Sequence, residues 1–446
     1  MGRATGLWRL RLRARSIGEQ AAILLYDALS WLLLPVLLPL LGWHPRLRGG
    51  LAQRLGCGLP RTLVGGERQP VWFHGASAGD LKALLPLLAH ARASGLPVVA
   101  SCWTRSAAEF LRAQGDPVPL LRAPLDLRWA VGRVLEAVAP RLVVAEGLEL
   151  WPAWSAACAA RGIPCVIVNG RLSPRSLRWY RRFGWLFRPR FADLRLVVAA
   201  TPGDAERFAA AGVPAERLQL SSSSKYAALE PLARADPRPP RSGSASDPPR
   251  LVLGSLHLAE ARQVLPELLR LLQRWPRLVI EIAPRYVHQT RRLLRLLQRG
   301  GVASRRVSQR PPAGLVPRVI VHDTMGALAQ TYAGAVAAFV GGSLVPHGGH
   351  NLIEPAARGV AVLHGPHVEH CRAEAALLAE RDASFMVGDA SQFGQTVDRL
   401  LADPTLAPQA GRAARRVAEE LATGAERITL LLAPLLIESA PTGSAR

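Results

Sequence analysis

The sequence predicts two α/β domains, each with a parallel β-sheet covered by helices on both faces. Its 446 residues are too many for one compact core and suffice for two domains of about 200 residues each. Short runs rich in β-branched residues alternate with segments of helical apolar spacing, which is typical of doubly wound sheets. A stretch rich in proline, serine and glycine divides the chain at 231–249 and predicts a linker.

The expected strands follow one another through both halves of the chain. In the first half, one strand is expected to end at Phe73 and His74, and four further apolar runs continue the alternation. In the second half, four runs repeat the pattern, so a second α/β domain is expected from residue 250. Two such domains facing each other across a cleft suggest a ligand held at the carboxyl ends of the strands. The runs are 97–103, 141–147, 164–170 and 195–201 before the linker, and 250–255, 277–284, 318–323 and 337–343 after it.

Charge narrows the classes of partner. The formal net charge is +23, and it comes almost wholly from arginine, since Lys82 and Lys225 are the only lysines. A positive field of this size attracts anionic membranes, nucleic acid or phosphorylated substrates. Nucleic acid is the least favoured partner, because no recognition helix, zinc finger or aromatic RNA-binding motif accompanies the charge. The five cysteines form no CxxC pair and no metal-binding spacing, which predicts reduced thiols in a cytosolic protein.

Residues 1–48 predict a membrane anchor. Five arginines precede the apolar run 23–41, but no small-residue cleavage site follows it, which argues against a secretory signal. Asp27, Pro35 and Pro39 interrupt the run, and arginines on both flanks give no preferred transmembrane orientation. We therefore expect a helix that dips into the cytoplasmic leaflet, with a single span as the second alternative and a buried core helix as the third.

The segment 73–91, FHGASAGDLKALLPLLAHA, combines a strand end, a turn of small residues and an apolar helix. Ser77 and Asp80 have the spacing of a capping box, in which their side chains accept hydrogen bonds from backbone amides at the helix start. A carboxylate there also suits the positive end of the helix dipole. From these residues alone, a helix cap is the favoured role for Asp80 and a catalytic base is the alternative.

A second segment, FVGGSLVPHGGHNLIEPAARGVAV at 339–362, predicts a strand, two glycine-rich turns, a helix and another strand. The glycines would let backbone amides approach an anion, and a helix beginning near His350 or Asn351 would direct its positive end at a phosphate. Glu354, one turn into that helix, is suited to accept hydrogen bonds from ribose hydroxyls. The alternative is that both turns are merely tight turns and Glu354 is a first-turn charge.

Several segments together match a known family. They are VWFHGASAGD, ELWPAWSAACAARGIPCVIVNGRLSPRS, GSLHLAE, APR, DTMGAL and FVGGSLVPHGGHNLIEPAARGVAVLHGPH. With them nearly the whole chain resembles the Kdo transferases, membrane-associated glycosyltransferases that add 3-deoxy-D-manno-octulosonic acid (Kdo) from CMP-Kdo to a lipid A precursor. The resemblance implies the GT-B fold, with an acceptor-binding domain at 49–230, a CMP-sugar-binding domain at 250–437 and a tail at 438–446.

The resemblance also implies the reaction and its site. It implies an inverting transfer, without a metal or other cofactor, from CMP-Kdo to an anionic lipid A precursor (lipid IVA) at the cytoplasmic side of the inner membrane. Asp80 takes the position of the family's catalytic glutamate, and Arg285 is expected to pair with the donor phosphate. The family's CMP contacts fall on Pro284, Arg285, Met325, Gly326, Ala327, Asn351, Leu352, Ile353 and Glu354.

This chain departs from the family pattern at three places in its acceptor-side and donor-side motifs. Asp80 is shorter than the family's glutamate by one carbon–carbon bond, about 1.5 Å. Gly147 and Leu148 stand where the family commonly has glutamate and threonine, which removes a carboxylate, and Ala327 stands where it has glutamate. A divergent transferase with another CMP-sugar or acceptor, or a catalytically silent homologue, is therefore the alternative function.

Further candidates lie at turns beside these motifs. The acceptor-side candidates are His74, Ser77, Gly79 and Arg171. The alternatives to binding are a strand-end histidine for His74, a helix N-cap for Ser77 and a solvated surface loop for Arg171. On the donor side, His257 and Glu260 lie at a strand-to-helix turn and are candidates to contact the donor, although Glu260 is also plausible as a first-turn helix charge.

Overall fold

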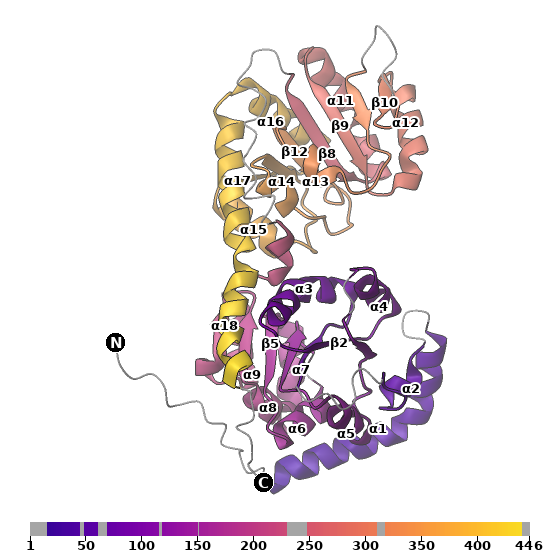
Figure 1. Ribbon diagram of the computed structural model, residues 1–446. Coiled ribbons are helices and arrows are strands. Elements are labelled where there is room, and N and C mark those ends of the chain that lie inside the picture. The colour runs from indigo at the N-terminus through magenta and orange to yellow at the C-terminus, as the bar shows by residue number, and fades with distance from the viewer. Residues whose placement is uncertain are drawn as a thin grey trace. The chain divides into compact units, whose positions relative to one another are not determined.

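The computed structural model describes residues 16–44, 49–60, 69–115, 118–149, 151–229, 248–309 and 317–438. The chain forms two compact units, and each is built on its own sheet (Figure 1). The first unit takes the residues up to Ala227 and those from Thr423 onward, and the second takes the residues between them. Most of the predicted linker, the basic N-terminal stretch before residue 16 and the tail beyond 438 lie outside the described residues.

The first unit contains a seven-stranded parallel sheet in the order β3-β2-β1-β4-β5-β6-β7. Its central strands are continuous apolar runs because helices bury both faces. The strand order reverses between β1 and β4, which makes their carboxyl ends the switch point where doubly wound sheets hold ligands. The strands are β1 Val71–His74, β2 Val98–Cys102, β3 Leu120–Arg122, β4 Leu142–Glu146, β5 Cys165–Gly170, β6 Leu196–Ala199 and β7 Leu218–Leu220.

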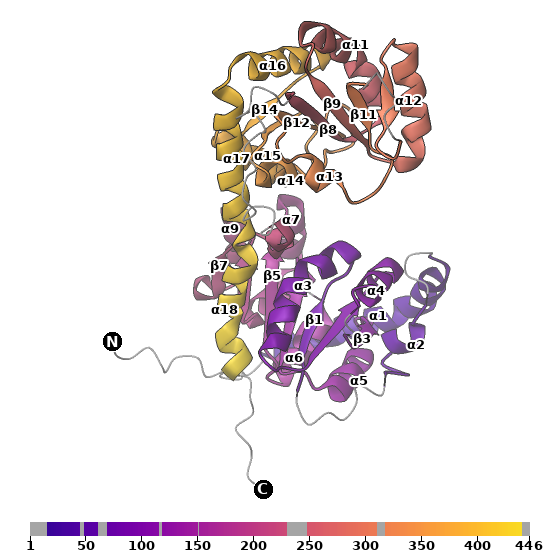
Figure 2. The same cartoon turned by 45° about the horizontal axis from the view of Figure 1, so that its top comes forward.

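Helices cover both faces of this sheet (Figure 2), and they bury alternate residues of the same strands. Phe73 packs with α3 and α4 on one face, whereas its neighbour Trp72 packs with α5 and α6 on the other. A third cluster joins α8 and α9 to the β5 and β6 side of the sheet. The helices are α2 Leu51–Arg54, α3 Ala78–Ala93, α4 Arg105–Arg112, α5 Arg128–Val138, α6 Pro152–Ala160, α7 Pro174–Arg182, α8 Gly184–Asp193 and α9 Pro202–Ala211, with 3₁₀ turns at Ala215–Arg217 and Ser224–Leu229.

The last helix, α18 (Gly424–Glu438), belongs to the first unit although it follows the second in sequence. Ile428, Leu432, Leu435 and Leu436 lie in the core cluster that also contains α3. Each buried aliphatic side chain contributes about 1.5–3 kcal/mol, which favours this return of the chain. The predicted boundary of 250–437 for the second domain is therefore wrong at its C-terminal end.

The N-terminal helix α1 (Ile17–Trp43) is continuous through both prolines of the apolar run. One side of it packs on the first unit, where Ile23 joins the cluster around α8 and Leu34 contacts the start of α5. The opposite side leaves large apolar side chains exposed, with Leu32 74% and Val36 61% exposed. This exposure rules out the buried core helix. Among the described helices, α1 alone is long and apolar enough to cross a membrane.

The second unit repeats the architecture with the strand order β10-β11-β9-β8-β12-β13-β14, again all parallel. The larger core cluster joins one face of the sheet to α11, α12 and α16, and a smaller one around Tyr332 covers the other face. The strands are β8 Arg250–Leu256, β9 Val279–Pro284, β10 Ser304–Arg306, β11 Val319–Val321, β12 Ala337–Val340, β13 Ala361–His364 and β14 Ser384–Met386. The helices are α11 Leu258–Arg274, α12 Thr290–Arg299, α13 Leu328–Thr331, α14 Ile353–Ala357, α15 Arg372–Glu380, α16 Ala390–Ala402 and α17 Leu406–Ala422, with a 3₁₀ turn at Val287–Gln289.

Candidate functional site

Two carboxylates meet at the switch point of the first sheet. Strands β1 and β4 pair with His74 opposite Ala145, so Glu146 is the next residue at the carboxyl edge. Asp80 lies in the first turn of α3, directly after β1. Asp80 is close enough to Glu146 to act on its pKa. Two adjacent central strands therefore bring an acid pair to the edge where a ligand is expected.

The capping box predicted for α3 is confirmed. The Ser77 amide donates to Asp80 Oδ2 at 2.7 Å, and the Asp80 amide donates to Ser77 Oγ at 3.4 Å. A Cβ atom at Gly75 would lie 3.1 Å from the Asp80 Cβ, so the turn packs closely against Asp80. The cap fixes one carboxylate oxygen of Asp80, and the carboxylate stays partly exposed.

Glu146 is the protonated member of the pair at neutral pH. Burial, the negative charge of Asp80 and the hydrogen bond to Asp80 raise the pKa of Glu146 to about 8. Arg171 and a 3.5 Å hydrogen bond from Asn169 Nδ2 to Glu146 Oε1 act in the opposite direction. Asn169 is held in turn by Ser224, whose amide donates to Asn169 Oδ1 and whose hydroxyl accepts from Asn169 Nδ2, both at 2.9 Å.

The sequence reasoning missed Glu146. The available signal was an acidic residue at the end of the apolar run 141–147, next to Gly147. The expectation that Gly147 removes a carboxylate from this region therefore needs correction, since Glu146 supplies one from the preceding position.

The acceptor-side candidates differ in accessibility. His74 is fully buried, with its Nδ1 atom 2.8 Å from Ser101 Oγ and its Nε2 atom 3.6 Å from Glu149 Oε2. It therefore has no surface for a ligand. Gly79 and Arg171 are exposed beside the carboxylate pair, and Ser77 is the N-cap of α3.

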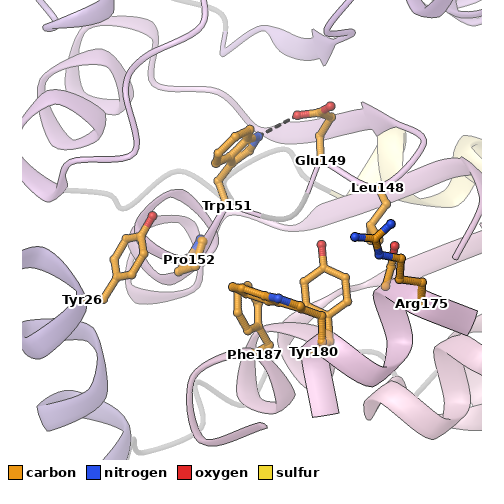
Figure 3. Close-up of a pocket in the computed structure, with 10 residues that line it drawn as sticks. Tyr26, Leu148, Glu149, Trp151, Pro152, Arg175, Tyr180 and Phe187 are labelled. Carbon is orange, nitrogen blue, oxygen red and sulfur yellow. Dashed lines mark hydrogen bonds between the residues drawn. The ribbon is translucent and has the colours of Figure 1, made fainter. Parts of the chain in front are cut away.

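A pocket of about 430 Å³ opens beside Glu149 (Figure 3). Trp151 Nε1 donates to Glu149 Oε2 at 2.7 Å, which fixes the carboxylate against the aromatic wall. Arg175 supplies a positive charge at the rim, and Tyr26 reaches the pocket from α1. Aromatic faces beside an acid and an arginine suit an amphipathic ligand that carries anionic groups. The lining residues are Tyr26, Leu148, Glu149, Trp151, Pro152, Arg175, Ser176, Trp179, Tyr180 and Phe187.

In the second unit, four neighbouring strands carry the predicted donor residues. Strands β11, β9, β8 and β12 are adjacent and parallel, so the segments that follow them share one edge of the sheet. Arg285 follows β9, His257 follows β8, the glycine turns follow β12, and the turn with Met325 follows β11. This edge contains the β8/β12 switch point of the second sheet.

The first glycine turn, 341–344, is filled by a carboxylate of the protein itself. Glu260 is fully buried and accepts hydrogen bonds from the amides of Gly342 at 2.8 Å, Ser343 at 2.9 Å and Leu344 at 3.0 Å. It also accepts the amide of His257 at 3.0 Å and so caps α11. The anion that these amides bind is Glu260 and not the expected phosphate, and Glu260 therefore has no contact surface for a donor.

Histidines gather beside Arg285 on the same edge. His257 Nε2 lies 3.0 Å from His350 Nε2, and the rings of His257 and His347 are 4.4 Å apart. Burial and the positive charge of Arg285 lower the pKa of His350 to about 4, and burial lowers the pKa of His257. Arg285 is itself exposed and lies over the Tyr286 ring at 5.3 Å. The structure thus brings Arg285 and the second glycine turn together.

The residues expected to contact the nucleotide, 351–354, differ in which of their groups are accessible to it. Helix α14 begins later than predicted and has five residues, so its dipole is small. Asn351 Oδ1 accepts the Ile353 amide at 3.0 Å, and Asn351 Nδ2 donates to Glu354 Oε1 at 3.1 Å. The Leu352 and Ile353 side chains are fully buried, so only their backbone can meet a nucleotide.

The remaining donor candidates form an exposed turn. Met325 is 81% exposed, Gly326 has a φ of +91°, and Ala327 is the N-cap of α13. Pro284 ends β9 and is partly buried. Within the described part of the chain, no group of three or more His, Cys, Asp or Glu residues is arranged to hold a metal, and a metal-independent reaction stays a prediction.

Relatives of known family match this chain over most of its length. A family model described as 3-deoxy-D-manno-octulosonic-acid transferase (kdotransferase) matches residues 49–228. The 3-deoxy-D-manno-octulosonic acid transferase of Haemophilus influenzae is 29% identical over 428 residues, which cover 92% of this chain and 98% of that protein. The protein of the same name from Bordetella pertussis is 32% identical over 373 residues, which cover 81% and 85%.

Solved structures at low identity support the fold. The MurG structure from Acinetobacter baumannii has a TM-score of 0.56 and 15% identity, and the match covers 82% of this chain and 99% of that one. UDP-GlcNAc 2-epimerase from Neisseria meningitidis has a TM-score of 0.55 and 12% identity, with 83% and 100% covered. The predicted GT-B class is confirmed by these neighbours and the two parallel sheets. On the sequence matches, the chain belongs to the 3-deoxy-D-manno-octulosonic acid transferase family of glycosyltransferases.

Proposed function

We propose that this glycosyltransferase transfers Kdo from CMP-Kdo to a glucosamine hydroxyl of an anionic lipid A precursor at the cytoplasmic face of the inner membrane. The observation that carries the proposal is the carboxylate of Asp80, held at the switch point of the first sheet in a chain of this family. A sugar hydroxyl is a weak nucleophile, and a carboxylate beside it can remove the proton as the new bond forms.

Acceptor binding is assigned to the aromatic pocket and the basic residues near it. Arg171 and Arg175 are both exposed and suit the phosphates of a lipid A precursor. The tryptophan and tyrosine walls suit its sugar faces and the first carbons of its acyl chains. Tyr26 adds α1 to the wall, which links the pocket to the helix that is expected at the membrane.

Donor binding is assigned to the carboxyl edge of the second sheet. Arg285 is exposed beside the histidine cluster, where it can pair with the donor phosphate and stabilise the charge that develops as CMP departs. The exposed turn 325–327 and the backbone at 351–354 are assigned to the nucleotide, with Glu354 on the ribose. Attack opposite the departing CMP inverts the anomeric carbon.

The membrane surface is assigned to α1. Its inner side packs on the folded unit, and its outer side exposes Leu25, Leu32 and Val36. A helix attached along its length to a soluble unit fits a position in one leaflet better than a span, which would need lipid around the whole helix.

A transfer assay tests the proposal. Purified protein, CMP-Kdo and a tetra-acylated lipid A precursor are expected to yield a Kdo-modified lipid. Asp80→Asn should lower kcat by about 100-fold or more, with CMP affinity and the unfolding midpoint unchanged. The matched control is Asp389→Asn, which caps α16 on the second unit and should transfer normally. CMP binding without transfer to any lipid precursor would overturn the proposal.

A further inference from the structure

The strongest unassigned feature is a pair of carboxyl groups at the switch point of the first sheet, with Asp80 directly after β1 and Glu146 at the end of the neighbouring strand β4. Burial raises the pKa of Glu146, and the charge of Asp80 and a hydrogen bond to it raise it further. A hydrogen bond between two carboxyl groups requires one proton between them. The two groups come from different elements, the first turn of α3 and the last residue of β4. The pair is therefore made by the fold at the switch point.

Each carboxyl group also accepts a hydrogen bond from a residue outside the pair. Asp80 Oδ2 accepts the Ser77 amide at 2.7 Å, which orients its other oxygen independently of Glu146. Glu146 Oε1 faces Asn169, and Asn169 has a left-handed φ of +54° stabilised by its two hydrogen bonds with Ser224. The charged groups that act on Glu146 are Asp80 from α3 and Arg171 from the turn after β5.

A purely structural role explains this arrangement poorly. If the pair served only to join α3 to β4, an acid and an amide would do so equally well, because they form a hydrogen bond without a shared proton. Burial of an acid whose pKa rises to about 8 also costs stability at neutral pH. Groups with such shifts, placed at the ligand-binding edge of a sheet, are more often part of a site.

We propose that Asp80 and Glu146 act as one composite base, in which the proton taken from the acceptor hydroxyl is shared between the two carboxylates. This inference rests on the proposed function. In the step, the O–H bond of the acceptor breaks and its proton passes to the pair. The hydroxyl oxygen forms a bond to the anomeric carbon of Kdo, and the bond from that carbon to the CMP phosphate oxygen breaks, with its electron pair leaving on the phosphate.

Sharing makes the pair a stronger base than either carboxylate alone. The reactive form is the dianion, and proton uptake converts it to the hydrogen-bonded monoanion that the structure stabilises. A base that titrates near the working pH is the most effective general base. Glu146 also compensates for the shorter side chain of Asp80, because this second carboxylate holds the proton after the transfer.

The test is a pH profile of kcat and KM for the full-length protein with CMP-Kdo and the lipid precursor. For the wild type, kcat is expected to rise with pH and to level near pH 8. In Glu146→Gln the rising limb near pH 8 should disappear, and kcat at pH 8 should fall about 10- to 100-fold. The KM for CMP-Kdo should stay unchanged.

The control is Glu136→Gln, an exposed glutamate of α5 paired only weakly with Arg161 at 3.4 Å, which should keep the wild-type profile. An infrared titration reports the shared proton without any substrate: a protonated carboxyl band should disappear near pH 8 and be absent from Glu146→Gln. An unchanged kcat profile in Glu146→Gln, in a wild type that transfers Kdo, would overturn the composite base alone. A wild type that shows the infrared band but transfers no Kdo would overturn the proposed function, and the role of the pair as its base with it.

Discussion

His257 Nε2 lies 3.0 Å from His350 Nε2, so one ring donates a hydrogen bond and the other accepts it. Both rings can be neutral in this arrangement, and the lowered pKa values of both agree with it. Arg285 adds positive charge to the same edge. The cluster is thus short of negative charge until an anion binds.

Binding of CMP should therefore raise the pKa of His350 from about 4, because a phosphate favours the imidazolium form. By linkage, CMP affinity should increase as the pH falls through the pKa of the complex. Nitrogen-15 NMR titration with and without CMP measures both effects. The exposed His90 on the first unit is the control, since its resonances should not respond to CMP. A His350 resonance that ignores CMP would contradict the donor assignment.

Glu260→Gln should destabilise the second unit. The amide can accept some of the four backbone N–H bonds, but its NH₂ group faces other donors and the charge that strengthens these bonds is lost. We expect a loss of about 2–4 kcal/mol in the free energy of unfolding, measured by urea denaturation. Glu419→Gln, on an exposed i,i+4 pair with Arg415, should change it by less than about 0.5 kcal/mol. Equal stability of the two variants would show that the turn does not depend on Glu260.

The strands that the sequence predicts and those that it misses differ in position. The missed strands β3, β7, β10 and β14 have three residues each and lie at the edges of the two sheets. Edge strands are buried on fewer sides and need no long apolar run, so their pattern is weak. The central strands are buried on both faces, and their sequences show it.

The same distinction applies to the candidate site. The cap at Asp80 and the glycine turns are local patterns, and sequence spacing predicts them well. The Asp80–Glu146 pair and the Glu260 contacts with 342–344 depend on which strands are neighbours, which no local pattern states. The return of α18 to the first unit has the same cause, because an apolar helix face does not specify the sheet that it covers.

The stability of the first unit should depend on pH through Glu146. Its pKa is higher in the folded state, about 8, than in the unfolded chain, about 4.5. The unfolded chain therefore loses this proton first, and the contribution of Glu146 to stability decreases as the pH rises from about 4.5 to 8. Glu146→Gln should remove that dependence and gain on the order of 1–3 kcal/mol relative to wild type at pH 8, and little at pH 4.5. Denaturant unfolding across this range measures it, and a constant difference between the two proteins would contradict the raised pKa.

The effects on kcat of changing the side-chain lengths of residues 80 and 146 should be coupled. Asp80 and Glu146 meet at the same edge of the sheet, so Asp80→Glu lengthens the pair by about 1.5 Å in a site that is closely packed by Gly75 and the Ser77 amide. We expect kcat to fall about 10- to 100-fold, since a displacement of about 1 Å at a reacting group has effects of this size. The exchange variant Asp80→Glu with Glu146→Asp restores the summed length and should recover most of the lost rate. A double-mutant cycle on kcat measures the coupling, and additive effects of the two changes would show that the carboxylates act independently.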